Sequence, residues 1–179
     1  MDRLTELLRE KAVRTGSFTL ASGKKSDLYV DARQVTLHAE GCRLIAEAIL
    51  DRLHPEVHAI GGLTMGADPV ACSVAALSTL RGRPVHAFLI RKKPKGHGTG
   101  GVLEGMGNVP AGTSVAVVED TTTTGSSLLE AVARAKEGGL HVVQCITVVD
   151  RQEGAAEAVA AAGLTLEALV TRELLLSDA

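Results

Sequence analysis

Short apolar segments alternate with amphipathic helical segments along most of this chain, and this alternation is what most restricts its fold. Apolar residues at helical spacing predict helices, and short apolar runs bounded by glycine or polar residues predict buried strands. Helices are predicted at residues 2–14, 40–53, 67–81, 126–139 and 153–163. Strands are predicted at residues 57–62, 84–90, 114–118, 141–149 and 164–170. Strands that alternate with helices form right-handed crossovers, so we expect an α/β fold with a mostly parallel central sheet flanked by helices.

Residues 16–33 lie outside this alternation. They read GSFTLASGKKSDLYVDAR and predict strand and turn. No repeat, linker or low-complexity tract interrupts the 179 residues, a length at which one compact domain is the usual outcome. We therefore expect a single domain over residues 1–179.

Composition argues against several classes of protein. The formal charge of −2 and the 2% of aromatic residues do not favour a nucleic-acid binder. No apolar run is long enough to span a membrane, and the charged N-terminus lacks the apolar segment of a signal peptide. Three separated cysteines, Cys42, Cys72 and Cys145, are typical of free thiols in a reducing cytoplasm. We expect them to be small core residues.

The segment at residues 115–132, which begins in the buried strand predicted at 114–118, carries the strongest functional signal. The segment reads VAVVEDTTTTGSSLLEAV, and its carboxylate pair is Glu119 and Asp120. Glycine and hydroxyl side chains at a helix N-terminus are suited to a phosphate group, and here they are Thr121, Thr122, Thr123, Thr124, Gly125, Ser126 and Ser127. The paired carboxylates would suit two ribose hydroxyls, or magnesium through water. We expect residues 121–124 to be loop; the alternative is a helix N-cap at Thr124 or Ser126 behind a solvated acidic pair.

A cationic, glycine-rich segment, RKKPKGHGTGG, follows the predicted strand at 84–90. Its cations and histidine are Arg91, Lys92, Lys93, Lys95 and His97. Charge-assisted hydrogen bonds to a polyphosphate are stronger than exposed ion pairs, so this segment predicts a flexible lid over an anion, at about residues 91–105. A solvated basic turn is the alternative. The spacing G-x-G-x-x-G also occurs here, but no helix can follow it, so a dinucleotide site is rejected.

Two further strand ends carry candidate ligand groups. In GGLTMGADPV, at residues 61–70, backbone amides could hold a second anionic group such as a pyrophosphate. In VVDRQEG, at residues 148–154, Arg151 could bind a planar carboxylate or carbonyl ligand. A surface ion pair is an equally good interpretation of Arg151.

Together these segments resemble the type I phosphoribosyltransferases and, within them, the orotate phosphoribosyltransferases. VVEDTTTTGSS is similar to the phosphoribosyl-diphosphate signature of the whole family. GSFTLASGKKSDLYVDAR, RKKPKGHGTGG and DRQEG are similar to segments that narrow the choice to the orotate branch. The resemblance implies a single-domain fold with a small N-terminal hood. It also implies transfer of ribose 5-phosphate from phosphoribosyl diphosphate to orotate, giving orotidine 5-phosphate and pyrophosphate in pyrimidine biosynthesis.

The resemblance also implies roles for individual residues. Lys95 and Asp120 would be catalytic, and Thr123 and Arg151 would contact orotate. Residues implied to bind phosphoribosyl diphosphate are Arg91, Lys92, Lys95, His97, Glu119, Asp120, Thr121, Thr122, Thr123, Thr124, Gly125, Ser126 and Ser127. Many relatives have a lysine where this chain has Ala21, and Lys24 or Lys25 could replace it.

Magnesium would be the cofactor, held through substrate and water rather than directly by the protein. The partners implied are orotate, phosphoribosyl diphosphate and a second copy of the chain in a cytoplasmic homodimer with shared sites, with no nucleic acid and no membrane. Two alternatives stay open. One is a purine phosphoribosyltransferase, whose base pocket would not need Arg151. The other is a non-catalytic regulator that senses phosphoribosyl diphosphate.

Overall fold

A computed structural model describes residues 2–19, 25–93 and 101–177 of the chain. Its helices are α1 (Arg3–Lys11), α2 (Arg33–Thr36), α3 (Ala39–Arg52), α4 (Ala67–Leu80), α5 (Ser126–Glu137), α6 (Ala155–Ala161) and α7 (Arg172–Leu176). Its strands are β1 (Val13–Thr19), β2 (Lys25–Val30), β3 (Ala59–Leu63), β4 (His86–Ile90), β5 (Leu103–Glu104), β6 (Ser114–Thr122), β7 (His141–Asp150) and β8 (Leu166–Thr171).

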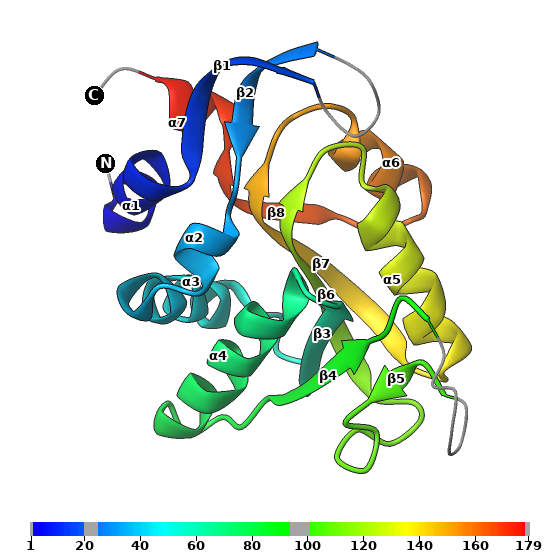
Figure 1. The fold of residues 1–179 in the computed structure, drawn as a ribbon. Coiled ribbons are helices and arrows are strands. Elements are labelled where there is room, and N and C mark those ends of the chain that lie inside the picture. Colours follow the sequence, from blue (N-terminus) through cyan, green and yellow to red (C-terminus); the bar gives the residue numbers. More distant parts are fainter. Residues whose placement is uncertain (1, 20–24, 94–100, 178–179) are drawn as a thin grey trace.

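The central sheet of the described residues has the strand order β5-β4-β3-β6-β7-β8 (Figure 1). Its strands pair in parallel except for the short β5, which is antiparallel to β4. Helices cover both faces, with α1, α3 and α4 on one side and α5 and α6 on the other (Figure 1). The predicted α/β class and the mostly parallel sheet are therefore confirmed.

Two apolar clusters, one on each face, hold the helices against the sheet. Alternate residues of β6 take opposite sides: Ala116 and Val118 join the cluster with α3 and α4, whereas Val115 and Val117 join the cluster with α5. This alternation is the two-residue period of a strand that is buried on both faces. All four side chains are at most 1% exposed.

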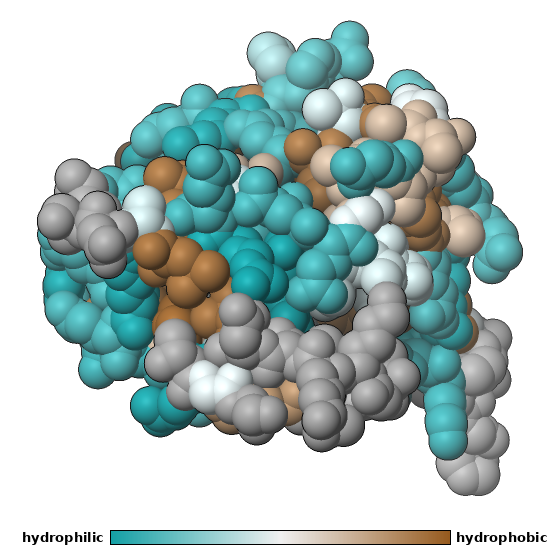
Figure 2. Space-filling model, turned by 90° about the horizontal axis from the view of Figure 1, so that it is seen from above, coloured by the Kyte–Doolittle hydropathy of each residue, from teal (hydrophilic) through white to brown (hydrophobic). Residues whose placement is uncertain are grey.

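The N-terminal part of the chain adds a separate antiparallel hairpin of β1 and β2, which is the expected hood. In Figure 1 the hairpin lies at the end of the molecule toward which β6 and β7 point. Seen onto that end, the surface is largely hydrophilic, with hydrophobic residues confined to compact patches (Figure 2). The hood therefore lies at the edge of the sheet where α/β proteins bind their ligands.

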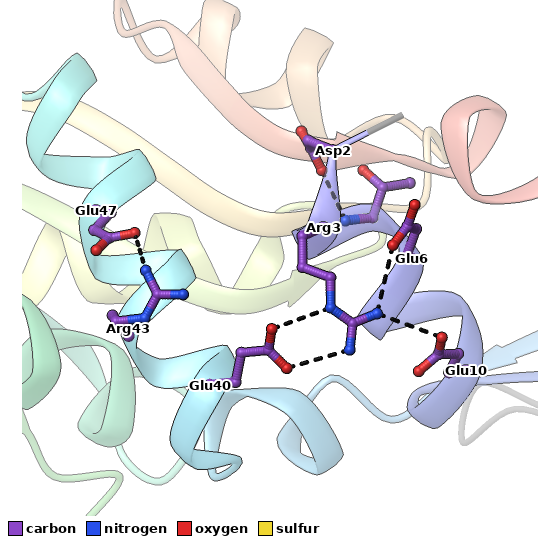
Figure 3. Close-up of polar contacts among 8 residues, drawn as sticks. Asp2, Arg3, Glu6, Glu10, Glu40, Arg43 and Glu47 are labelled. Atoms are coloured by element: carbon purple, nitrogen blue, oxygen red, sulfur yellow. Dashed lines mark hydrogen bonds and ion pairs between the residues drawn. The ribbon is translucent and has the colours of Figure 1, made fainter.

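Ion pairs attach α1 to the body of the protein. Arg3 on α1 pairs with Glu40 on α3 through its Nε at 3.1 Å and its Nη2 at 3.2 Å, and it also pairs with Glu6 and Glu10 (Figure 3). On the other side of α1, Arg9 Nε donates to the carbonyl of Leu175 at 3.0 Å. These contacts hold α1 against both α3 and α7.

Four of the sequence-based expectations need correction. Strand β6 continues through Thr122, so the expected loop at 121–124 is wrong for its first half. Its ladder with β7 extends to the pair Thr122 and Asp150, and β-branched threonines favour strand once a partner strand is present. The first helix ends at Lys11 because Val13 already pairs in the hairpin. The short elements α2, β5 and α7 were not predicted, since each has too few residues to show a period.

The fourth correction concerns the cysteines. Only Cys145 lies in the core, whereas Cys72 is exposed and Cys42 is intermediate. Among the described residues, no helix combines the length and the apolar character that crossing a bilayer requires.

Candidate functional site

A polar cavity of about 320 Å³ opens at the carboxyl ends of β3 and β6. The hairpin supplies one wall, the turn before α4 another, and the end of β6 the floor. The described lining residues are Val30, Asp31, Ala32, Arg33, Leu63, Thr64, Met65, Gly66, Lys92, Glu119, Asp120, Thr121 and Ser127. Four segments that are far apart in sequence therefore meet at one end of the sheet.

The predicted carboxylate pair lies on the floor of this cavity. Glu119 is 9% exposed, and the Asp120 carboxylate accepts a hydrogen bond from the backbone N–H of Thr121 at 2.8 Å. Gly66 packs against both side chains, because a Cβ on Gly66 would lie 2.7 Å from Asp120 Oδ1 and 3.1 Å from Glu119 Oε1. The carboxylates are thus fixed by close packing as well as by the strand that carries them.

Burial raises the pKa of both carboxyl groups in this pair. It raises the pKa of Glu119 from its ordinary 4.5 to about 7; the neighbouring Asp120 carboxylate adds to the increase, and Lys92 opposes it. Burial also raises the pKa of Asp120, against the hydrogen bond from Thr121 and the positive charge of Arg33. Carboxylates with a raised pKa are good acceptors for neutral hydroxyl groups, because a diol supplies hydrogen bonds without adding charge.

The hydroxyl-rich turn after β6 lines a second, smaller pocket of about 110 Å³ that shares Glu119, Thr121 and Ser127 with the first. The pocket also contains Thr122, Thr123, Thr124, Gly125, Ser126 and Leu128. Gly125 is the N-cap of α5 with a left-handed φ of 79°, and no described side chain caps that helix. Thr124 Oγ1 bonds instead to Ser126 Oγ at 2.9 Å.

The capping alternative at Thr124 or Ser126 is therefore wrong. Open N–H groups at the start of a helix attract an anion through their partial positive charge. The twelve-residue α5 begins in this pocket and is long enough to contribute such a field. The arrangement is suited to a phosphate monoester beside the Glu119–Asp120 pair.

The start of the cationic segment reaches the same cavity. Lys92 is one of the lining residues, whereas Arg91 forms an ion pair with Glu104 at 2.5 Å. Arg134 on α5 donates to the backbone carbonyls of both residues, at 3.2 Å for Lys92. Lys95 and His97 lie outside the described residues, and so does Lys24, one of the two candidates to replace the lysine missing at position 21.

Arg151 lies behind the hairpin rather than in the wall of either pocket described above. It is 5% exposed, its Nη2 donates to the carbonyl of Leu28 on β2 at 3.3 Å, and it pairs with Glu153 at 2.8 Å. Thr123, its expected companion, lines the smaller pocket. The alternative of a surface ion pair is wrong only about its location: Arg151 does pair with Glu153, but a guanidinium this deeply buried is not a surface group.

Within residues 61–70, where backbone amides were expected to hold an anionic group, only a part borders the cavity. Gly61 and Gly62 belong to β3, where a Cβ would lie 2.1 Å from the carbonyl oxygens of Phe88 and Val118 respectively. Both glycines are therefore required by sheet packing. Only Thr64, Met65 and Gly66, together with the preceding Leu63, border the cavity. Asp31 and Arg33 were not proposed as site residues, although their position at the end of a hairpin strand would have been a signal.

The donor set in the cavity fits a magnesium ion that is held mainly by substrate and water. Carboxylates of Asp31, Glu119 and Asp120 open to one cavity, and magnesium prefers oxygen ligands while keeping several waters. Among the residues that the structure describes, no group of three or more His, Cys, Asp or Glu side chains is arranged to hold a metal by itself.

Comparison with known proteins decides the family. A sequence model of the phosphoribosyl transferase domain matches residues 34–169, most of the chain. An orotate phosphoribosyltransferase from Rhodopseudomonas palustris (strain TIE-1) is 46% identical over 170 residues, which cover 93% of this chain and 91% of that protein. One from a Nostoc species is 43% identical over 169 residues, covering 94% and 82%. The chain belongs to the orotate phosphoribosyltransferase family.

Solved structures agree with this assignment to the orotate phosphoribosyltransferases. The Mycobacterium tuberculosis H37Rv enzyme, crystallised with Fe(III) dicitrate, superposes with a TM-score of 0.85 at 42% identity and covers 97% of both chains. A second structure of that enzyme, in complex with phosphoribosyl diphosphate, superposes with a TM-score of 0.79 at 38% identity and covers 96% of each chain. Adenine phosphoribosyltransferase from Leishmania tarentolae shares the fold at only 16% identity, with a TM-score of 0.69.

Proposed function

We propose that this chain is a pentosyltransferase that transfers ribose 5-phosphate from phosphoribosyl diphosphate to orotate, yielding orotidine 5-phosphate and pyrophosphate for pyrimidine (UMP) biosynthesis. The observation that carries the proposal is the carboxylate pair of the buried Glu119 and the half-buried Asp120, beside an uncapped, hydroxyl-rich helix N-terminus at the end of β6. Its relatives at 43–46% identity are orotate phosphoribosyltransferases.

In this proposal the two pockets hold different parts of the donor. The smaller pocket takes the 5-phosphate through the residues from Thr121 to Ser127, and Glu119 and Asp120 accept hydrogen bonds from the ribose 2- and 3-hydroxyls. The diphosphate then extends into the larger cavity, toward Lys92 and the backbone of residues 64–66. Arg91, Lys95 and His97 complete the cationic side in this proposal.

The reaction replaces one bond at the anomeric carbon of ribose by another. A ring nitrogen of orotate forms a bond to the anomeric carbon of ribose as the bond from that carbon to the diphosphate oxygen breaks. The electron pair of the broken bond leaves with pyrophosphate, and the proton of the ring nitrogen passes to pyrophosphate or to water. Negative charge grows on the leaving group as this bond breaks, so the step needs charge stabilisation there more than a strong base. Magnesium bound to the diphosphate would supply part of that stabilisation as a Lewis acid.

The protein supplies the remaining contributions. Lys92, and by proposal Lys95, place positive charge where negative charge grows on the leaving group. Two unit charges about 4 Å apart interact by about 4 kcal/mol at an effective dielectric of 20. The carboxylates of Glu119 and Asp120 hold the ribose and place negative charge near the cationic, oxocarbenium-like sugar.

Arg151 distinguishes the orotate branch from the purine branch. A buried guanidinium behind the hairpin, at the start of the β7–α6 turn, is suited to a carboxylate-bearing base, whereas a purine carries no carboxylate. Its contacts with Leu28 and Glu153 hold it between the hairpin and the sheet. In this proposal it exchanges part of these contacts for the orotate carboxylate.

The proposal includes a homodimer with shared sites. Leu37 and Met65 are 70% and 68% exposed, and both line an apolar surface pocket with Pro69 and Cys72. Met65 also lines the polar cavity, so a second copy of the chain seated here would lie beside the catalytic residues. Leu37→Asp should give a monomer in light scattering and lower the activity; a dimer that persists would place the interface elsewhere. The free cysteines fit a reducing compartment, and we propose the cytoplasm.

Orotate consumption tests the assignment directly. The ultraviolet absorbance of orotate should fall only when phosphoribosyl diphosphate and magnesium are both present, and Arg151→Ala should abolish the change. Unchanged orotate absorbance together with turnover of guanine or hypoxanthine would assign the chain to the purine branch. Binding of phosphoribosyl diphosphate without turnover of any base would favour a sensor.

A further inference from the structure

One buried carboxylate outside both pockets contacts the two segments that would hold the two halves of the product. Asp150 is the last residue of β7 and is 6% exposed. We propose that Asp150 is a positioning residue, which fixes the distance between the 5-phosphate pocket and the base-binding Arg151. This inference rests on the proposed function.

A single oxygen of Asp150 accepts both contacts. The hydroxyl of Thr122, the last residue of β6, donates to Asp150 Oδ1 at 3.2 Å. The backbone N–H of Gln152, in the turn between β7 and α6, donates to the same oxygen at 2.9 Å. Asp150 thus joins the base of the phosphate pocket to the turn that carries Arg151.

The backbone reinforces this connection on both sides of the turn. The N–H of Arg151 donates to the carbonyl of Thr122 at 3.0 Å, so the two candidate subsites are adjacent through the main chain as well. At the far end of the turn, Ala155 packs under the phosphate pocket, where a Cβ on Gly125 would lie 3.2 Å from its Cα. A displacement of the β7–α6 turn would therefore also displace Gly125.

The turn is held in a conformation that needs support. Gln152 has a φ of 54°, in the left-handed region that a residue with a side chain occupies at a cost. Two contacts hold it: its N–H on Asp150, and its side-chain carbonyl, which accepts from the N–H of Glu173 in α7 at 2.9 Å. Without the Asp150 oxygen, the Gln152 N–H and the Thr122 hydroxyl both lose their acceptor.

The consequence is specific to ligands that occupy both subsites at once. Ribose 5-phosphate fills only the phosphate and ribose positions, whereas orotidine 5-phosphate must also reach Arg151. Displacing one subsite relative to the other reduces the advantage of joining two binding groups in one molecule, and leaves the binding of either group alone nearly unchanged. Asp150→Ala should therefore weaken the binding of orotidine 5-phosphate more than that of ribose 5-phosphate.

The experiment measures the dissociation constants of ribose 5-phosphate and orotidine 5-phosphate by calorimetry on the full chain. We expect Asp150→Ala to raise the dissociation constant of orotidine 5-phosphate by at least about tenfold and that of ribose 5-phosphate by no more than about threefold. Asp150→Asn keeps the accepting oxygen and should restore orotidine 5-phosphate binding. If the alanine variant does not fold, Asp150→Ser can keep the turn contact while losing Thr122, and should show the same unequal loss.

Ser78→Ala is the matched control. Its hydroxyl is also buried and accepts from a backbone N–H, that of Val85 at 2.9 Å, but on the far half of α4. This variant should lose stability without altering the ratio of the two constants. Equal losses for both ligands in Asp150→Ala, no loss at all, or an asparagine variant as weak as the alanine one would overturn the inference. Failure of the wild-type chain to bind orotidine 5-phosphate would instead overturn the proposed function.

Discussion

The buried acid at the floor of the cavity should make the protein less stable as the pH rises, and replacing Glu119 by glutamine should remove this loss. The carboxyl of Glu119 is held by β6 and is buried beside Asp120, which together raise its pKa from 4.5 to about 7. Glutamine has nearly the same shape and hydrogen-bonding reach, but it never ionises. The substitution therefore isolates the cost of the charge.

The sign follows from proton binding. Between about pH 4.5 and 7 the folded protein holds the Glu119 proton while the unfolded chain releases it, so the free energy of unfolding decreases across that interval. Each pKa unit is worth about 1.4 kcal/mol, so the interval corresponds to about 3 kcal/mol. Glu119→Gln should match the wild type near pH 4 and be more stable by about 3 kcal/mol near pH 8.

Urea unfolding of both proteins across this pH range measures the difference, and in thermal unfolding near pH 8 it should appear as an increase of about 6–12 °C in Tm. The same variant should lose tight binding of phosphoribosyl diphosphate, because an anionic acceptor for a ribose hydroxyl is gone. Glu56→Gln removes an exposed carboxylate and should change stability by less than about 0.5 kcal/mol. An identical pH dependence in Glu119→Gln and wild type would refute the reasoning.

Three further substitutions test the neighbouring parts of the site. Gly125→Ala places a side chain at a φ of 79° and 3.2 Å from Ala155, with a left-handed strain of about 1–2 kcal/mol that should displace the turn. Calorimetry should then show ribose 5-phosphate binding about tenfold more weakly. An unchanged affinity would mean that this turn is not part of the phosphate pocket. Arg134→Ala removes the donors that hold the carbonyls before the cationic segment, and steady-state kinetics should show a KM for phosphoribosyl diphosphate that rises several-fold while that for orotate stays constant. Lys95→Ala should lower kcat far more than it weakens orotate binding; equal losses in both would mean that Lys95 binds the ground state and transition state alike.

The sequence predicted the parts of the fold that depend on long periodic segments. The helix at Ala39–Arg52 and the strand at His141–Asp150 each lie within about a residue of the expected range, because their apolar spacing is set by burial against the sheet. The end of β6 was mispredicted, since Thr121 and Thr122 are in a strand only because β7 runs beside them. Pairing of this kind is a property of the tertiary structure.

The candidate site also divides into residues that one sequence segment reveals and residues that only the tertiary structure brings to the site. Glu119, Asp120 and the residues to Ser127 were found because one continuous segment carries all of their chemistry. Asp31 and Arg33 were missed because they reach the cavity only through the folding of the hairpin over the end of the sheet. Gly66 was expected to offer only its backbone, and its packing against both carboxylates is a property of the tertiary structure. Asp150 directly precedes Arg151 in the sequence, but its contact with Thr122 depends on the register of two strands.

A crystal structure of the chain with phosphoribosyl diphosphate and magnesium tests the central claim most directly. We predict the 5-phosphate on the backbone amides and hydroxyls of residues 123–127, with the ribose 2- and 3-hydroxyls on Glu119 and Asp120. A donor bound with its 5-phosphate away from this turn, or with its ribose out of reach of both carboxylates, would contradict the account.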